Sequence, residues 1–223
     1  MSINTETYLR IRDELAAANV TLVAVSKTKP VEDIQALYDL GHRDFGENYV
    51  QELVDKATQL PPDIRWHFIG HLQSNKVKYI APFVSLIHGI DSIKLLQEVN
   101  KQAAKNDRVI DCLLQVHIAS EETKFGFDDA SLRDALPQLT AGNTPFDRVR
   151  IRGLMGMASF TEDNLQVKQE FSHLHQLFSI SQKQMPPTHD FSILSMGMSS
   201  DYQLAVAEGS TMVRIGSLLF GSR

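Results

Sequence analysis

Short runs of apolar and β-branched residues alternate along the 223-residue chain with longer segments whose apolar residues recur at helical spacing. The short runs predict strands at residues 22–26, 43–45, 66–69, 86–90, 111–118, 150–155, 191–194 and 212–215. The longer segments predict helices at 31–40, 49–59, 74–80, 93–105, 130–139, 165–182 and 201–208, after an amphipathic N-terminal helix near 6–18. Strand and helix therefore alternate from one end of the chain to the other.

This order predicts an α/β fold with a parallel sheet, because a helix between two strands returns the chain to the same end of the sheet. Such units can close into a (β/α)8 TIM barrel, here a single domain spanning residues 1–223 with an extra N-terminal helix. An open doubly wound sheet is the alternative. The first loop disfavours it, since the sequence at 26–30 is Ser-Lys-Thr-Lys-Pro and not the glycine-rich turn that binds dinucleotides.

Composition and charge exclude several functional classes. The chain is 43% apolar and 22% charged, with a net charge of −5, and no apolar run approaches the ~18 residues of a membrane span. The N-terminus lacks the pattern of a secretory signal, so we expect a cytoplasmic protein without a membrane partner. The acidic balance predicts no nucleic-acid partner. The single cysteine, Cys112, lies in an apolar run and is expected to be a buried hydrophobe rather than a nucleophile.

In a barrel of this kind the loops that follow the strands gather at one end, where binding and catalytic residues are found. Polar and glycine-containing loops follow the predicted strands at 27–29, 46–48, 70–76, 91–92, 120–126, 155–158, 195–201 and 216–217. We therefore expect a single rim to carry the chemistry of this protein.

The loops after the seventh and eighth strands predict a phosphate site. Ser199 or Ser200 is placed to cap a helix that begins near Asp201, which would direct backbone N–H groups at an anion. Gly197 and Gly216 permit close approach of the backbone, and barrels often bind phosphate at this position. The alternative interpretation of Ser-Ser-Asp is a helix cap without a ligand.

Two cationic side chains stand out against apolar strands. Lys27 follows the apolar run at 22–25, which places its amine in the barrel mouth beside Lys29, where it can attack an aldehyde. Arg214 lies inside the apolar eighth strand and needs a buried partner or a place at the rim. The alternatives are a surface position for Lys27 and an internal carboxylate partner for Arg214.

An imine-forming amine, an anion site and a partner for a ring nitrogen together suggest pyridoxal 5′-phosphate as cofactor. Arginine does not stabilise a protonated pyridine ring as an aspartate does, so carbanion chemistry on the cofactor is poorly supported.

Six segments carry a resemblance that covers essentially the whole chain. They are AVSKTKP at 24–30, FGENYVQE at 45–52, WHFIGHLQSNK at 66–76, RGLM at 152–155, SMGMSSD at 195–201 and VRIG at 213–216. In this order they resemble the pyridoxal phosphate homeostasis protein family, whose members are similar to the N-terminal barrel domain of alanine racemase.

The resemblance implies that Lys27 forms the internal aldimine and that Asn48 approaches the cofactor. It also implies that Ser199, Gly216 and Ser217 hold the phosphate and that Arg214 faces the pyridine nitrogen. Lys124 matches a family lysine near the cofactor entrance. The remaining residues expected at the cofactor site are Ser195, Gly197, the strand-end methionines Met155 and Met198, and His67 as a hydrogen-bonded interior histidine beneath the site.

For function, the resemblance implies a protein that binds pyridoxal phosphate and takes part in its homeostasis and in amino-acid and keto-acid balance, without established catalysis. Its expected ligands are pyridoxal phosphate, other B6 vitamers and amino acids, and a monomer is expected because the second domain of alanine racemase, with its tyrosine acid/base, is absent. Racemisation needs proton-handling groups on both faces of the cofactor, and only Lys27 is an obvious one.

Two other functions stay open at the sequence level. One is a low-activity pyridoxal phosphate enzyme, a racemase, aldolase or decarboxylase, with Tyr49, His67 or Lys76 as proton donor. The other is a barrel that binds a sugar or nucleotide phosphate. Metal binding is not expected from the histidine spacing, and the carboxylates of Glu47, Glu121 and Glu122 are expected to form solvated ion pairs at the rim.

Overall fold

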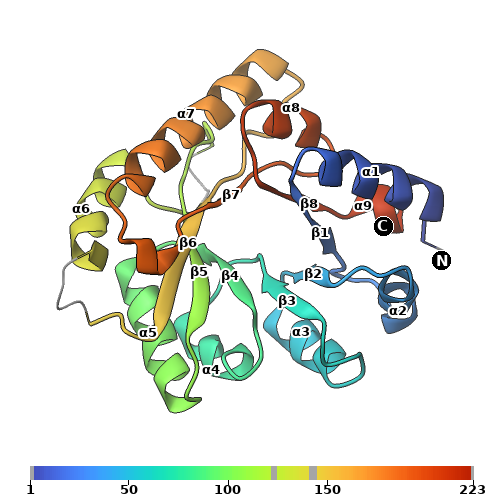
Figure 1. The fold of residues 1–223 in the computed structure, drawn as a ribbon, viewed down its shortest axis with the longest axis horizontal. Helices are drawn as coiled ribbons and strands as arrows, with labels where there is room; N and C mark the ends of the chain where they lie inside the picture. Colours follow the sequence, from blue (N-terminus) through green and yellow to red (C-terminus); the bar gives the residue numbers. More distant parts are fainter. Residues whose placement is uncertain (1–2, 122–124, 141–144, 222–223) are drawn as a thin grey trace.

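The computed structural model describes residues 3–121, 125–140 and 145–221, and within these ranges the chain forms a closed barrel of eight parallel strands (Figure 1). The strands run around the barrel in sequence order, and β8 pairs with β1 to close it. Their bounds are β1 Thr21–Val25, β2 Asp44–Glu47, β3 Arg65–Phe68, β4 Leu86–Ile90, β5 Ile110–Gln115, β6 Val149–Met155, β7 Ile193–Ser195 and β8 Met212–Ile215. The prediction of a (β/α)8 barrel is confirmed.

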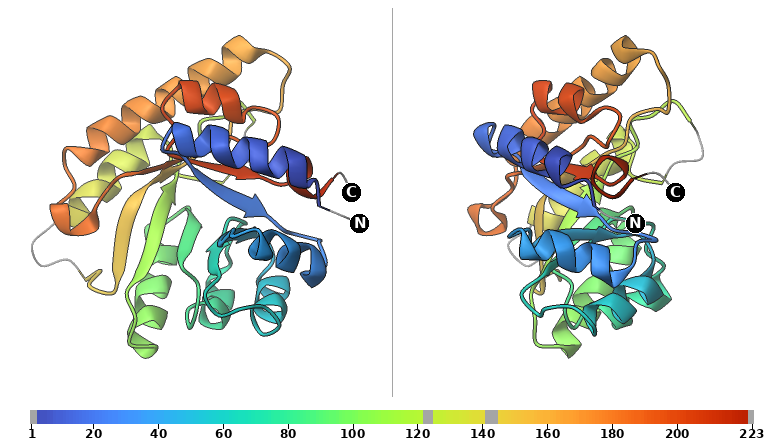
Figure 2. Two further views of the ribbon diagram at one scale, coloured as in Figure 1. Left: turned by 45° about the vertical axis from the view of Figure 1, so that its right-hand side comes forward. Right: turned by 90° about the vertical axis from the view of Figure 1, so that its right-hand side faces the viewer.

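Helices surround the strands on the outside of the barrel (Figures 1 and 2). Their bounds are α1 Thr5–Ala17, α2 Val31–Asp39, α3 Val50–Ala57, α4 Val77–Ile80, α5 Ile93–Lys105, α6 Asp129–Thr140, α7 Asn164–Gln182, α8 Tyr202–Ala207 and α9 Ser217–Phe220, with short 3-10 turns at Ser74–Lys76 and Pro187–His189. The Asn4 N–H donates to the Leu219 carbonyl over 2.8 Å, which joins the start of α1 to α9. None of the helices in the described ranges is both long and apolar enough to cross a membrane.

The interior and the outer layer of the barrel have different cores. The outer faces of the strands and the inner faces of the helices share one large apolar cluster. A second, small cluster fills the inside of the barrel and consists of Val23, Leu86, Leu113, Met155 and Met212, one from each of five strands. Since this small cluster occupies only part of the interior, the remaining inward positions can carry polar side chains.

The predicted β5 extends too far. The sequence predicted a strand to residue 118, but the barrel strand ends at Gln115. Beyond it the chain pairs with a later segment, because the Phe127 N–H donates to the Gln115 carbonyl and the His117 N–H to the Phe127 carbonyl. The apolar run from Val116 therefore continues outside the barrel as an isolated bridge to Phe127. The short α9 was also not predicted.

Gly153 in β6 lies where the backbones of β6 and β7 come very close together. Gly153 has φ +154°, and a Cβ at this position would collide with the Ile193 carbonyl of β7. We expect Gly153→Ala to lower the free energy of unfolding by well over the ~1–2 kcal/mol that a positive φ alone costs an L residue. Urea denaturation of the two proteins measures the difference.

Gly41→Ala is the matched control, because Gly41 has φ +94° with open space around its Cβ position. Equal losses of stability in the two variants would contradict the steric explanation.

Candidate functional site

A cavity of about 520 Å³ opens at the ends of the strands where the βα loops meet. Seven of the residues predicted for the cofactor site line it: Lys27, Asn48, Met198, Ser199, Arg214, Gly216 and Ser217. Arg214 lies in β8, Ser217 begins α9, and the segments after β1, β2, β7 and β8 supply the others. The structure thus brings together residues that lie up to 190 positions apart in the chain, at the end of the barrel that the βα order predicted.

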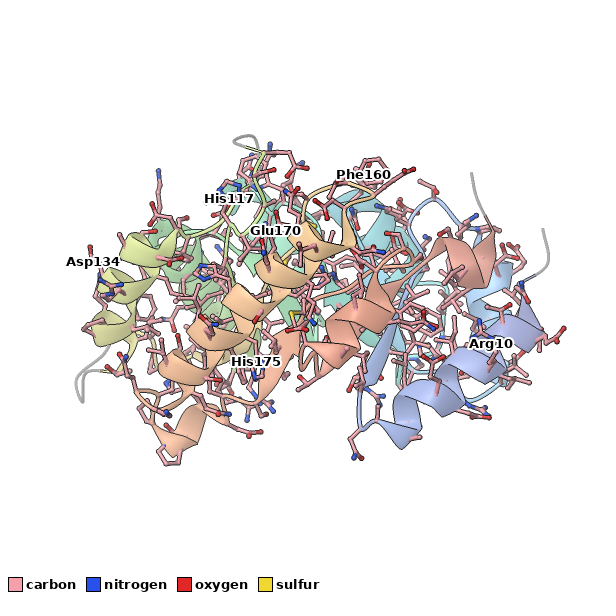
Figure 3. The ribbon with its side chains drawn as sticks, turned by 90° about the horizontal axis from the view of Figure 1, so that it is seen from above. Arg10, His117, Asp134, Phe160, Glu170 and His175 are labelled. Carbon is pink, nitrogen blue, oxygen red and sulfur yellow. The ribbon has the colours of Figure 1, made fainter. Side chains whose placement is uncertain are left out.

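Further residues outside the predicted cofactor set line the cavity, and the sequence had already placed Lys29, Met157 and Ser200 in loops at this rim. These further residues are Val25, Thr28, Lys29, Ile69, Met157, Phe160, Ser200, Leu218 and Gly221. Phe160 follows β6, and its side chain is 96% exposed (Figure 3). Its loop is tied to α7, because the Ser159 N–H and hydroxyl donate to the two oxygens of Glu170 over 2.7 and 2.6 Å. The mouth of the cavity therefore carries a projecting aromatic ring on an anchored loop.

Lys27 lies in a tight turn at the end of β1. The Lys29 N–H donates to the Ser26 carbonyl over 3.0 Å, and Thr28 has φ +63°, which is rare for a β-branched residue. The Thr28 N–H donates to Glu52 Oε1 of α3 over 2.5 Å. The turn is thus held from α3 in a conformation that its own residues do not favour.

A buried ion pair lies directly under this turn. Lys56 Nζ lies 2.8 Å from Glu47 Oε1 and 2.6 Å from Glu52 Oε1, and it donates to the Ser26 carbonyl over 2.7 Å. The Ser26 hydroxyl donates to the same Glu47 oxygen over 2.6 Å. The side chain of Glu47 is fully buried, and burial raises its pKa although Lys56 and Ser26 oppose the shift.

The expectation of a solvated rim position for Glu47 is therefore wrong. Glu47 ends β2 with its side chain between the barrel and α3, where Lys56 neutralises it, so it belongs to the support of the Lys27 turn. The other Glu47 oxygen, Oε2, is buried without a hydrogen-bond partner in the described part of the chain. Glu122 and Lys124 lie outside the described residues.

Arg214 points inward from β8 and forms the floor of the cavity. It is 4% exposed, and its guanidinium donates to the Ser195 carbonyl and hydroxyl over 2.9 and 2.6 Å and to the Gly156 carbonyl over 3.0 Å. Burial lowers its pKa to about 10, and Asp201 opposes the shift. Arg214 therefore keeps its charge at neutral pH, held by oxygen atoms of two neighbouring loops.

The expected capping of α8 by Ser199 or Ser200 is wrong. The helix begins at Tyr202 with Asp201 at its N-cap, and the Asp201 carboxylate accepts from the Met198 N–H over 2.6 Å. The Ser199 hydroxyl instead accepts from the Gly216 N–H over 3.2 Å. The Asp201 side chain makes no capping hydrogen bond to α8, and the Ser199 hydroxyl links the loops after β7 and β8 at the cavity.

Four predicted site residues lie behind the cavity wall. Met155 belongs to the interior apolar cluster, and Ser195 binds Arg214 from below. Gly197 has φ +98°, and its carbonyl accepts from the Arg214 N–H. His67 is buried and hydrogen-bonded to His88 and Asp44, as the interpretation of an interior histidine predicted. These residues can act on a ligand only through others.

Asn48 has an orphaned polar atom at the cavity. Its side-chain Oδ1 is buried and has no hydrogen-bond partner within the described residues. Leaving a buried amide oxygen unpaired costs stability. A ligand that fills the cavity and offers a donor at this point would remove that cost.

Neither metal nor thiol chemistry is supported. No group of three or more potential metal-ligating side chains occurs among residues 3–121, 125–140 and 145–221. Cys112 is fully buried, which raises the pKa of its thiol and confirms its expected role as a buried hydrophobe.

Comparison with known proteins adds independent information. Residues 5–223 match the model of the alanine racemase N-terminal domain family. The pyridoxal phosphate homeostasis protein of Pasteurella multocida is 41% identical over 207 residues, covering 92% of this chain and 87% of that protein.

Two solved structures of PipY from Synechococcus elongatus PCC7942 are 38% identical and cover 97% of this chain and 99% of theirs. The TM-score is 0.90 for PipY without PLP and 0.86 for PipY with PLP bound.

The buried pair beneath the Lys27 turn generates a prediction. We expect Lys56→Met to lower the free energy of unfolding by about 3–5 kcal/mol, because Glu47 is left buried without its cation. Chemical denaturation at neutral pH measures this loss. Adding Glu47→Gln should restore part of it, since the uncompensated charge is then removed.

Lys78→Met is the matched control, because Lys78 is an exposed helical lysine. A Lys56→Met variant as stable as this control would show that the ion pair does not support the turn.

Proposed function

Because this chain belongs to the pyridoxal phosphate homeostasis protein family, we propose that it binds pyridoxal 5′-phosphate (PLP) in the cavity and takes part in PLP homeostasis. One observation carries the proposal beyond the family match. The cavity joins the Lys27 amine, the orphaned Asn48 amide, the buried Arg214 cation and the hydroxyl-bearing loops after β7 and β8. PLP has an aldehyde, a ring and a phosphate, and these groups could bind all three: the amine the aldehyde, the amide and the cation the ring, and the loops the phosphate.

The residues present fit the cofactor. Asn48 lines the cavity, and a bound group that donates to its unpartnered Oδ1 would remove the cost of leaving this oxygen buried without a hydrogen bond. The hydroxyls of Ser199 and Ser217 and the backbone at Gly216 line the side of the cavity formed by the last two loops, where phosphate binds in many barrels. The volume of about 520 Å³ lies within the range of ordinary small-molecule sites.

PLP supplies an aldehyde carbon that condenses with amines. In the proposed complex the Lys27 ε-amine would condense with this carbon to a Schiff base, with the aldehyde oxygen leaving as water, and Asn48 would contact the ring. Ser199, Gly216 and Ser217 hold the phosphate. Amino acids and other B6 vitamers are the further ligands that we propose, since free amines compete with Lys27 for the same carbon.

Arg214 faces the ring nitrogen in this proposal. Its guanidinium has only donors, and its pKa of about 10 keeps it protonated at neutral pH. It would therefore donate to the nitrogen lone pair and leave no place for a proton there. A ring without that proton would withdraw electrons weakly, which would favour storage of the cofactor over carbanion chemistry.

We propose that the protein is not an enzyme. The titratable side chains that line the cavity within the described residues are Lys27, Lys29 and Arg214. Lys29 Nζ donates to the Phe220 and Gly221 carbonyls over 3.0 and 3.1 Å. The candidate proton donors Tyr49, His67 and Lys76 do not line the cavity. This supports binding and management of PLP, because racemisation needs a proton-handling group on each face of the cofactor.

A monomeric state and a cytoplasmic location are also part of the proposal. Each barrel strand and its covering helices bury their apolar faces within one chain, so the described fold does not need a partner for its core. The single buried cysteine suits a reducing compartment. Light scattering of the purified protein tests the monomer directly.

Covalent attachment tests the proposed function. We expect the protein treated with PLP and then with borohydride to gain the mass of one reduced pyridoxyl phosphate group on Lys27, located by peptide mapping. Lys27→Ala should fold with nearly unchanged stability, because a rim lysine contributes little core burial, but should gain no mass.

Lys29→Ala is the matched control in the same loop, and it should still gain the group. A Lys27→Ala protein that is labelled as completely as the wild type would refute the assignment, and a wild-type protein that gains no mass would refute the proposed function.

A further inference from the structure

A continuous chain of polar side chains crosses the barrel interior from its lower end to the cavity floor. The Arg214 guanidinium lies 2.6 Å from Ser195 Oγ, and Ser195 Oγ lies 3.1 Å from His88 Nδ1. His88 Nε2 lies 3.0 Å from His67 Nδ1, and His67 Nε2 lies 3.1 Å from Asp44 Oδ1. Five different strands contribute, and His88 at its centre is fully buried.

The two ends of the chain fix the direction of their own hydrogen bonds. A guanidinium only donates and a carboxylate only accepts. Ser195 therefore accepts from Arg214, and His67 donates from Nε2 to Asp44. When His88 carries its single hydrogen on Nε2, it donates to His67 Nδ1, and its Nδ1 accepts from the Ser195 hydroxyl.

The Asp44 end is anchored as a carboxylate. Arg65 donates to both Asp44 oxygens over 2.7 and 2.5 Å. Burial opposes the charge, but the bonds from Arg65 and His67 outweigh it and hold the pKa of Asp44 well below its usual range. At the other end, Arg214 keeps its charge. Neither end can reverse its role at neutral pH.

We propose that this chain positions Arg214 for the cofactor, with His88 as the central positioning residue. His88 accepts the Ser195 hydroxyl proton in this arrangement, so that Ser195 presents its lone pairs to Arg214. The guanidinium is then held at the cavity floor at the angle that the Ser195 and Gly156 oxygens impose. This inference rests on the proposed function, because it assigns a role toward the PLP ring nitrogen.

A second hydrogen on His88 would reverse its bond to Ser195. The ring would then donate from Nδ1, and Ser195 Oγ would accept from His88 and from Arg214 at once. Burial is the largest cause that lowers the pKa of His88 well below its usual value, and His67 and Arg214 add to it. The other titratable or charged groups facing the chain, among described residues, are His42 and Arg65 near Asp44 and Asp201 near Arg214.

Ring-nitrogen NMR of the full-length protein tests the chain itself, with and without added PLP. We expect His88 to be neutral with hydrogen on Nε2 between about pH 6 and 8, whereas an unperturbed histidine titrates in this range. The signals of His88 are assigned with His88→Asn. Hydrogen on Nδ1 of His88, or titration of its ring in this range, would overturn the proposal.

The bound cofactor provides the second readout. We expect His88→Phe to shift the absorption spectrum of bound PLP and to speed its release about tenfold, as the loss of a hydrogen bond to a charged group does. Lys27 should remain labelled after borohydride. His88→Asn keeps an acceptor near the position of Nδ1 and should restore most of the spectrum.

His189→Phe is the matched control, because His189 is another buried histidine, bonded to the Ile151 N–H at the start of β6. It should lower stability without moving the spectrum. A folded His88→Phe protein with the spectrum and release rate of the wild type would overturn the positioning role. Absence of any labelling in the wild type would instead refute the proposed function and leave the NMR result standing.

Discussion

Charged side chains buried among apolar ones must find hydrogen-bond partners there, and this requirement organises the functional end of the molecule. Lys56 is placed against Glu47 and the Ser26 carbonyl, and Arg214 against Ser195 and Gly156. The first set holds the turn that carries Lys27, and the second holds the floor opposite. Because both sets are buried, the cavity between them has walls that are set before any ligand arrives.

Much of this architecture follows from local sequence pattern. β4, β8 and α5 have the predicted bounds, since apolar alternation and helical spacing are strong there. Seven predicted residues line the cavity because parallel strands place the loops that follow them at one end, whatever the details of packing. The roles predicted for Asn48 and Ser217 came from the family resemblance, because an asparagine and a serine do not indicate a cofactor site by residue type alone.

What the sequence did not reveal depends on contacts between elements. Lys56 looks like an ordinary helical lysine until α3 packs over the Lys27 turn. His88 sits in a strand that reads as apolar, and only barrel closure places it between His67 and Ser195. Met155 points into the apolar interior and Met157 into the cavity, a difference set by where β6 ends. The start of α8 at Tyr202, with Asp201 and not a serine at its N-cap, likewise did not follow from the sequence.

A crystal structure of the protein grown with PLP tests the central claim most directly. The account predicts continuous electron density from Lys27 Nζ to the cofactor, the phosphate beside Ser199 and Ser217, and the ring nitrogen within hydrogen-bond distance of Arg214. Density for PLP elsewhere on the surface, or none beside the Lys27 amine at saturating PLP, would contradict it.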